Sequence, residues 1–250
     1  MNGFGYQDIF ADEYSRLTGN VDRQQMLSYI LSKLRAHSID KGIVLDAGCG
    51  SGDLCLLLCK QGYDMIGVDE SFDMLTAAME KAHDQNCDIL FLGQPLCELD
   101  LYGTIDAAVS TLDTINHITD IEELQESLDR ISLFMVPGGI FIFDVNTRYK
   151  HEQVLGNNCF VYDYEDLYCG WQNEYDPEEE ITAIKLDFFE KTDSGYVRSE
   201  QEFYERYYSP EILQHLLTNA GFTILEIQDD YTENEPGETT QRVVYVVQKD

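Results

Sequence analysis

The chain has 250 residues, enough for one large α/β domain or for a domain with a sizeable insertion. It carries 47 Asp and Glu residues against 16 Lys and Arg, a formal net charge of −31. Such a chain repels phosphate backbones and anionic membranes, so we expect neither a nucleic-acid partner nor a membrane partner.

Targeting and redox signals agree with a cytoplasmic location. The chain contains no run of about 18 apolar residues, the length that a membrane helix needs. Its N-terminal residues lack the basic and apolar regions of a signal peptide. The seven cysteines are scattered and odd in number, which predicts reduced thiols.

The first strongly periodic segment is a helix. Apolar residues recur at helical spacing over residues 22–36, which predicts an amphipathic helix with Asn20 or Asp22 as its N-cap. Before it, aromatic residues spaced by four, beginning at Tyr6, would share one face of a further helix.

The stretch 43–69 organises the fold. An apolar run leads into a turn with glycine at every second position from Gly48 to Gly52, a helix is predicted over 52–61, and a second apolar run ends at Asp69. This order is a βαβ unit with a nucleoside site at its first turn. Glycine permits backbone angles and a close approach of ligand that a Cβ would forbid. Asp69 lies 17 residues past Gly52, near the roughly 20 residues expected for an acid that binds ribose hydroxyls.

Asp46 decides which nucleoside suits this turn. It precedes the first glycine by two residues, at the helix N-terminus where a dinucleotide would place its anionic pyrophosphate. A carboxylate would repel that group, whereas it would attract a cationic ligand without phosphate. S-adenosylmethionine has an adenosine, an ammonium and a sulfonium, and it fits this requirement.

The later elements continue the alternation of strands and helices. The predicted strands are 64–68, 88–92, 105–110 and 140–145, and the predicted helices include one capped by Ser71, one through Leu124, Leu128 and Ile131, and one from Ser209 to Gly221. Two final strands, 222–227 and 242–248, are expected to pair antiparallel.

Between residues 158 and 208 the helical periodicity is lost. Aromatic and β-branched residues alternate with polar ones, which predicts an antiparallel sheet of about three or four strands. Trp171 and Tyr175 are expected in the core of this sheet, with a place on the wall of a pocket as the alternative.

Three motifs carry a resemblance to a known family. The run V-L-D-A-G-C-G-S-G from Val44 to Gly52 resembles the first motif of the class I S-adenosylmethionine-dependent methyltransferases. The run D-x-S-x-x-M-L from Asp69 and the run V-P-G-G from Val136 match further landmarks. The chain looks closest to stand-alone bacterial small-molecule methyltransferases with a β insertion, and it is also similar to the glycine and amino-sugar N-methyltransferases.

The resemblance implies a fold and a domain division. The expected fold is α/β: a Rossmann-like seven-stranded sheet with helices on both faces, one reversed edge strand, and a small antiparallel β insertion after strand 5. Residues 1–157 and 209–250 would form the S-adenosylmethionine-binding domain, with 1–37 as a helical lid. Residues 158–208 would form the insertion.

The family also implies which residues bind the cofactor. Its entry segment Y-x-x-F-A-x-x-Y, here from Tyr6 to Tyr14, folds over the cofactor with the second tyrosine near the reactive methyl. Gln94 stands where an acid is usual, yet its amide oxygen can still accept from the adenine amino group. The residues expected to bind S-adenosylmethionine, or its product S-adenosylhomocysteine, are Tyr6, Tyr14, Asp46, Ala47, Gly48, Cys49, Gly50, Asp69, Glu70, Met74, Gln94, Pro95, Leu96, Leu112 and Asp113.

Catalysis needs few residues in such an enzyme. Methyl transfer from a sulfonium is an in-line displacement that depends mainly on alignment and desolvation. A base is required only if the acceptor must lose a proton. His117 falls where similar amino-sugar N-methyltransferases direct a histidine toward the acceptor; the alternative is a histidine that packs at the start of the next helix. Tyr14 is the second candidate, as a residue that positions the acceptor. No metal is expected.

The expected activity is methyl transfer to a small-molecule acceptor, an amine, by a monomer or homodimer. Two alternatives remain open: a methyltransferase that acts on a protein, and a non-catalytic S-adenosylmethionine-binding module. A nicotinamide oxidoreductase is disfavoured by Asp46 and by the antiparallel ending, which replaces a second nucleotide-binding half.

Overall fold

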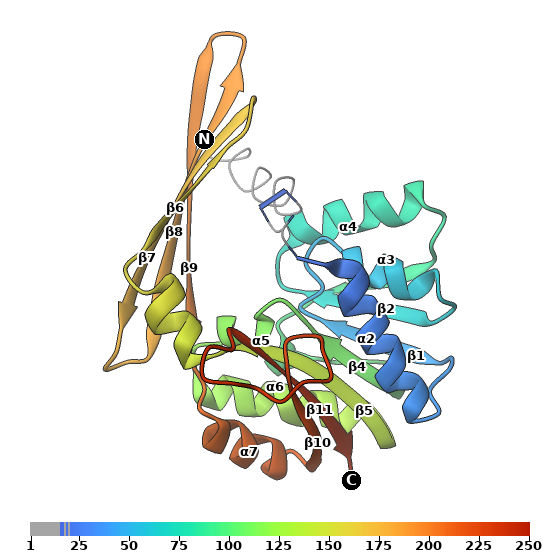
Figure 1. Cartoon of the computed structure of the whole chain (residues 1–250). Coiled ribbons are helices and arrows are strands. Elements are labelled where there is room, and N and C mark those ends of the chain that lie inside the picture. The colour runs from blue at the N-terminus through green and yellow to red at the C-terminus, as the bar shows by residue number, and fades with distance from the viewer. Residues whose placement is uncertain (1–15, 18, 20) are drawn as a thin grey trace.

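Two sheets organise the chain (Figure 1). The computed structural model describes residues 16, 17, 19 and 21–250. The larger sheet has the strand order β10-β11-β5-β4-β1-β2-β3, and its strands are β1 Ile43–Ala47, β2 Asp64–Asp69, β3 Ile89–Gly93, β4 Ile105–Ser110, β5 Met135–Asn146, β10 Phe222–Asp229 and β11 Arg242–Lys249. The smaller sheet has the order β6-β7-β8-β9, with strands β6 Cys159–Asp163, β7 Leu167–Asp176, β8 Ile181–Thr192 and β9 Gly195–Arg206.

The predicted fold class is confirmed, with one correction to the larger sheet. Strands β1 to β5 pair in parallel, and the final pair β10–β11 is antiparallel as expected. The reversed strand was expected at the edge, and this is wrong. The reversed strand is β11, which is antiparallel to both β5 and β10. It returns between them, so β10 forms the edge.

Helices cover both faces of the larger sheet (Figure 1). The helices are α2 Arg23–Ala36, α3 Asp53–Cys59, α4 Phe72–Asp84, α5 Thr114–His117, α6 Ile121–Phe134 and α7 Pro210–Asn219, with two short segments, η1 Leu96–Glu98 and η2 Lys150–Leu155. Side chains of α2, α3 and α4 share one apolar core with strand residues such as Val109, and side chains of α6 and α7 share the other with Phe141. The predicted cap of α2 is confirmed at Asp22, whose carboxylate accepts from the N–H groups of Gln24 and Gln25.

The smaller sheet stands away from the larger one as a long twisted ribbon (Figure 1). Its strands pair as antiparallel neighbours throughout, which the period-two pattern predicted. One face buries an apolar cluster that includes Leu167, Cys169 and Phe188. The sheet lies within the expected range 158–208; its role as a lid stays a prediction.

Two local features differ from the sequence expectation. Strand β5 begins at Met135, five residues before the expected start, because Met135 already pairs with Ile105 ahead of a register shift. The segment η2 is a π-helix, which the sequence did not predict.

All seven cysteines are free thiols. Within the described residues, no helix is both long and apolar enough to cross a membrane.

Candidate active site

A cavity of about 1550 Å³ lies at the carboxyl edge of the parallel strands. Each strand contributes its end: Gly48 follows β1, Asp69 ends β2, Gln94 follows β3 and Leu112 follows β4. The strand order reverses between β1 and β4, and ligands of open α/β sheets bind at such a switch point. Ligand pockets usually measure about 300–1000 Å³, so this cavity has room for two ligands.

The glycine turn adopts the backbone that the sequence predicted. Gly48, Gly50 and Gly52 have φ values of +74°, +49° and +76°, which residues with a Cβ rarely adopt. A Cβ on Gly48 would overlap the side chain of Thr114, whereas a Cβ on Gly50 would meet no atom within 4 Å. The space in front of the turn is therefore open to a ligand.

Asp69 is held toward this space by backbone donors. Its two carboxylate oxygens accept from the N–H of Gly50 at 2.8 Å and from the N–H of Ser71 at 2.9 Å. Each oxygen keeps a second lone pair, so the carboxylate can also accept from ribose hydroxyls. Burial raises the pKa of Asp69.

Asp46 lies beneath the turn and does not line the cavity. It is 1% exposed, and the Cys55 thiol donates to its Oδ2 at 3.1 Å. Burial raises the pKa of Asp46 to about 7. Asp46 instead borders a small pocket of about 50 Å³ together with Gly48, Cys49 and Gly50. Its direct contact with a cofactor stays a prediction.

Most of the predicted cofactor residues meet at one cavity. Those that line it are Gly48, Gly50, Asp69, Glu70, Met74, Gln94, Pro95, Leu96, Leu112 and Asp113. Asp46, Ala47 and Cys49 do not, and Ala47 is buried with its carbonyl accepting from Ser110. Tyr6 and Tyr14 lie outside the described residues. Trp171 packs against the apolar cluster of the smaller sheet, as expected, and also lines the cavity, whereas Tyr175 does not line it.

These residues fit S-adenosylmethionine. Asp69 offers acceptors at the ribose position, and the largely buried Met74 lines the same cavity. Gln94 and Leu96 line the cavity where the adenine is expected. The open space before Gly50 supplies the close backbone approach that the ligand needs.

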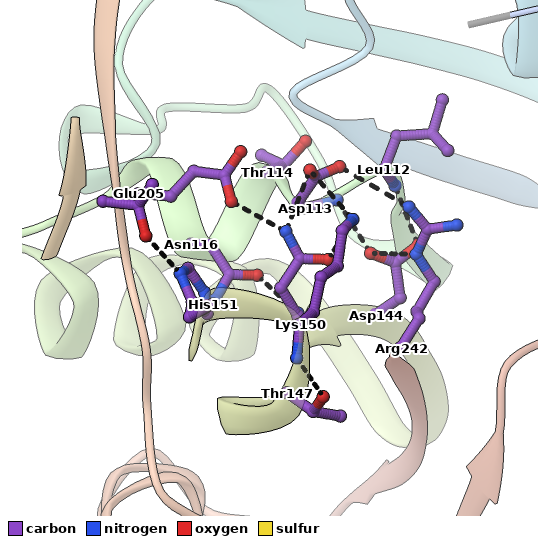
Figure 2. Close-up of polar contacts among 12 residues, drawn as sticks. Leu112, Asp113, Thr114, Asn116, Asp144, Thr147, Lys150, His151, Glu205 and Arg242 are labelled. Atoms are coloured by element: carbon purple, nitrogen blue, oxygen red, sulfur yellow. Dashed lines mark hydrogen bonds and ion pairs between the residues drawn. The ribbon is translucent and has the colours of Figure 1, made fainter. Parts of the chain in front are cut away.

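The turn after β4 is strained and anchored from below. Leu112 and Asp113 have φ values of 58° and 63°, two consecutive left-handed residues that are not glycine. Their N–H groups donate to the two oxygens of Asp144, each at 2.8 Å. Tyr231 also donates to Asp144, and Arg242 lies 3.6 Å from it. Figure 2 shows this carboxylate between the turn and Arg242.

Asn146 joins the larger sheet to the insertion. Its side-chain N–H₂ donates to Asp113 at 3.1 Å and to Glu205 of β9 at 2.7 Å. Its Oδ1 accepts from Lys150 at 2.7 Å, and its backbone N–H donates to Asn116 at 2.8 Å. Every polar group of this buried side chain therefore has a partner.

The two carboxylates that Asn146 bridges differ in ionisation. Burial opposes the charge of Asp113, but Lys150 and Arg242, at 4.0 Å and 3.7 Å, lower its pKa to about 2. Burial and the neighbouring charge of Asp113 raise the pKa of Glu205 to about 7. With pKa values separated in this way, Asp113 suits the role of a fixed negative charge, and Glu205 suits the role of a group that gains and loses a proton.

His117 ends the short helix α5 and lines the cavity. Its ring is exposed and lies 5.2 Å from the ring of Phe203, centroid to centroid. Ligand atoms of Asp113, His117 and Glu205 all lie within 4.8 Å of one another. His117 as a base and His117 as a packing residue before the next helix, α6, both stay predictions.

Several residues of this site were missed by sequence reasoning. Asn146 ends strand β5 and Lys150 follows it at the same carboxyl edge, which is a signal that the sequence does contain. Arg242 and Glu205 arrive from distant strands, and nothing local marks them.

Comparisons with known proteins agree with this geometry. A family model described as "Methyltransferase domain" matches residues 44–139. A protein of Geobacillus sp. (strain WCH70) that bears a methyltransferase name is 30% identical over 97% of this chain and 99% of its own length. The crystal structure of an S-adenosylmethionine-dependent methyltransferase from Clostridium acetobutylicum ATCC 824 superposes with a TM-score of 0.89, at 28% identity, over 98% of each chain.

More distant relatives differ in the atom that they methylate. A ubiquinone biosynthesis O-methyltransferase of Rickettsia canadensis (strain McKiel) is 24% identical, over 84% of this chain and 76% of the relative. A glycine/sarcosine N-methyltransferase of Parasynechococcus marenigrum (strain WH8102) is 23% identical, over 90% of this chain and 78% of the relative. Sequence, fold and site together show that the chain belongs to the class I S-adenosylmethionine-dependent methyltransferases.

Proposed function

We propose that this enzyme transfers the methyl group of S-adenosylmethionine to a small-molecule amine. The supporting observation is the group formed by Asp113, His117 and Glu205 on the cavity wall. An alkylammonium must lose its proton before its lone pair can attack. A carboxyl and an imidazole beside the cavity offer places for that proton.

The chain's own residues divide the work. Asp69 holds the nucleoside, and the anchored turn at Asp113 fixes the end of the cavity where the two ligands meet. The cofactor, when bound, supplies a methyl group already activated on a sulfonium. His117 is exposed at the cavity wall and can pass a proton to solvent. Trp171 and Phe203 of the insertion line the acceptor side and limit water.

The charge and the cavity also indicate what kind of acceptor the enzyme binds. The net charge of −31 favours a cationic acceptor and disfavours nucleic acid and anionic membranes. A cavity with room for two ligands supports a small-molecule acceptor over a protein. We further propose a monomer or homodimer and, from the seven free thiols, a cytoplasmic location.

A screen of acceptors tests the proposal. Matched amines, alcohols and carboxylic acids are incubated with the cofactor, and S-adenosylhomocysteine is measured for the wild type and for Asp69→Ala. We expect turnover with amines that Asp69→Ala reduces. Turnover confined to alcohols or acids would overturn the choice of acceptor, and cofactor binding without any turnover would favour a non-catalytic module.

A further inference from the structure

Glu205 is a buried acid that forms no salt bridge within the described part of the chain. Its side chain lines the cavity and is 3% exposed. Its Oε2 accepts from Asn146 at 2.7 Å. Among the described residues, no Lys or Arg nitrogen lies within 4.0 Å of its carboxylate, whereas Asp113 has both Lys150 and Arg242 at that range. A buried carboxylate normally has a charged partner, so a ligand is the expected source of one.

The local charge indicates which kind of cation fits. Four acids, Asp113, Asp144, Asp230 and Glu205, are grouped here with two cations, Lys150 and Arg242. The two cations contact the three aspartates, so an added positive charge is favoured beside Glu205. A metal ion held by Asp113, His117 and Glu205 would lie close to the ammonium of Lys150, which is 4.0 Å from Asp113 and would repel it. His117 lies at the same place, and its ring is exposed to solvent.

The insertion contributes several aromatic side chains to the wall of the cavity. Phe160 of β6, Trp171 of β7 and Phe203 of β9 line the same cavity as Glu205, and Tyr162 of β6 joins them. Aromatic faces attract alkylammonium groups and pack against apolar bodies. The ligand class that fits is therefore an alkylammonium on an apolar or ring-shaped body.

We infer that Glu205 holds the ammonium group of the acceptor and takes up its proton, which His117 then passes to solvent. The inference rests on the proposed amine methylation. The acceptor nitrogen gives one proton to the Glu205 carboxylate, and its freed lone pair forms the new N–C bond with the methyl carbon. The S–C bond breaks, its electron pair stays on sulfur, and a methylated ammonium and a neutral thioether remain. The raised pKa of Glu205 suits a group that accepts a proton near neutral pH.

Binding of a model amine tests the first half of the inference. Cyclohexylamine and cyclohexanol are titrated at pH 8 into protein saturated with S-adenosylhomocysteine, and affinities are measured by calorimetry or ligand-observed NMR. We expect the wild type to prefer the amine by about tenfold or more, the scale of one charge-assisted contact. Glu205→Gln should lose this preference. Glu202→Gln is the matched control, because Glu202 lines the cavity from the same strand but is exposed.

Kinetics with any amine found by the screen test the second half. Glu205→Gln should raise KM and lower kcat/KM by about 10²- to 10⁴-fold, whereas His117→Ala should mainly lower kcat. If Glu205→Gln does not fold, Glu205→Asp keeps the charge at a shorter reach, and it should retain the preference for the amine with lower turnover. Unchanged binding of S-adenosylhomocysteine shows that each variant keeps its cofactor site.

The outcomes separate the inference from the proposed function. An absence of amine turnover in the wild type, with cofactor bound, would overturn both. Amine turnover that survives in Glu205→Gln with an unchanged KM would overturn the inference alone. Stoichiometric binding of Zn²⁺ or Mn²⁺ to the wild type, lost in Glu205→Gln, would also overturn it and assign a metal site to the three side chains.

Discussion

Replacement of Asp144 by Asn tests how the cavity floor is held. Asp144 is fully buried and accepts from the N–H groups of Leu112 and Asp113 and from Tyr231. The Asn amide keeps one oxygen as an acceptor, but its NH₂ group replaces the other and faces a donor that has lost its acceptor. Each buried polar group left unpaired in this way costs about 1–3 kcal/mol. Loss of one partner of a buried ion pair costs about 3–5 kcal/mol. Arg242 keeps Asp113 and Asp230 as partners at 3.7 Å and 3.8 Å, so we expect a cost at the lower end of the roughly 3–5 kcal/mol range.

We therefore expect the free energy of unfolding to fall by about 3 kcal/mol, out of the 5–15 kcal/mol typical of a protein. The released turn should leave its left-handed conformation part of the time, which weakens S-adenosylhomocysteine binding about tenfold. Urea unfolding and calorimetry measure the two effects. The matched control is Asp106→Asn: Asp106 accepts from the N–H of Ile43 at 2.8 Å, at the start of β4 and away from the cavity. That variant should lose about 1 kcal/mol and keep its affinity. Equal stability and affinity in Asp144→Asn and the wild type would refute the reasoning.

Four further outcomes are expected. Asp69→Ala should weaken cofactor binding by about 1–3 kcal/mol in calorimetry, whereas Asp73→Ala, on the same cavity wall, should leave it nearly unchanged. His117→Ala should lower turnover by roughly 10²-fold or more at unchanged cofactor affinity, and an equal rate would return His117 to a packing role. The pKa of Glu205, about 7 against its ordinary 4.5, means that the folded state binds this proton more tightly, so stability falls as pH rises from about 4.5 to about 7. Glu205→Gln should therefore gain up to roughly 3 kcal/mol over the wild type between pH 5 and pH 8 in urea unfolding. Replacement of 158–208 by a short linker should, in a folded variant, preserve cofactor binding, and its loss would assign part of the cofactor site to the insertion.

The cofactor half of the site could be predicted because its signals are local. The glycine turn and Asp69 lie in one βαβ unit, and the backbone angles that glycine permits are those the turn adopts. Asp46 shows the limit of such reasoning. The sequence placed its carboxylate at the mouth of the turn, but the structure buries it against Cys55.

The acceptor half could not be predicted in the same way. Glu205 lies near the end of a strand with alternating burial, and its sequence does not reveal that it faces Asn146 across 59 positions. Arg242 reaches Asp144 only because β11 returns between β5 and β10. Contacts of this kind depend on how distant strands pair, which no local pattern encodes.

The central claim is that the enzyme methylates a nitrogen held at Glu205. The most direct measurement uses S-adenosylmethionine with a trideuterated methyl group, the amine acceptors from the screen and their matched alcohols, with mass spectrometric fragmentation to locate the label. We predict label on nitrogen in the wild type and in Glu202→Gln, and its near loss in Glu205→Gln at unchanged binding of S-adenosylhomocysteine. Label on oxygen, or equal labelling of nitrogen in both variants, would contradict the claim.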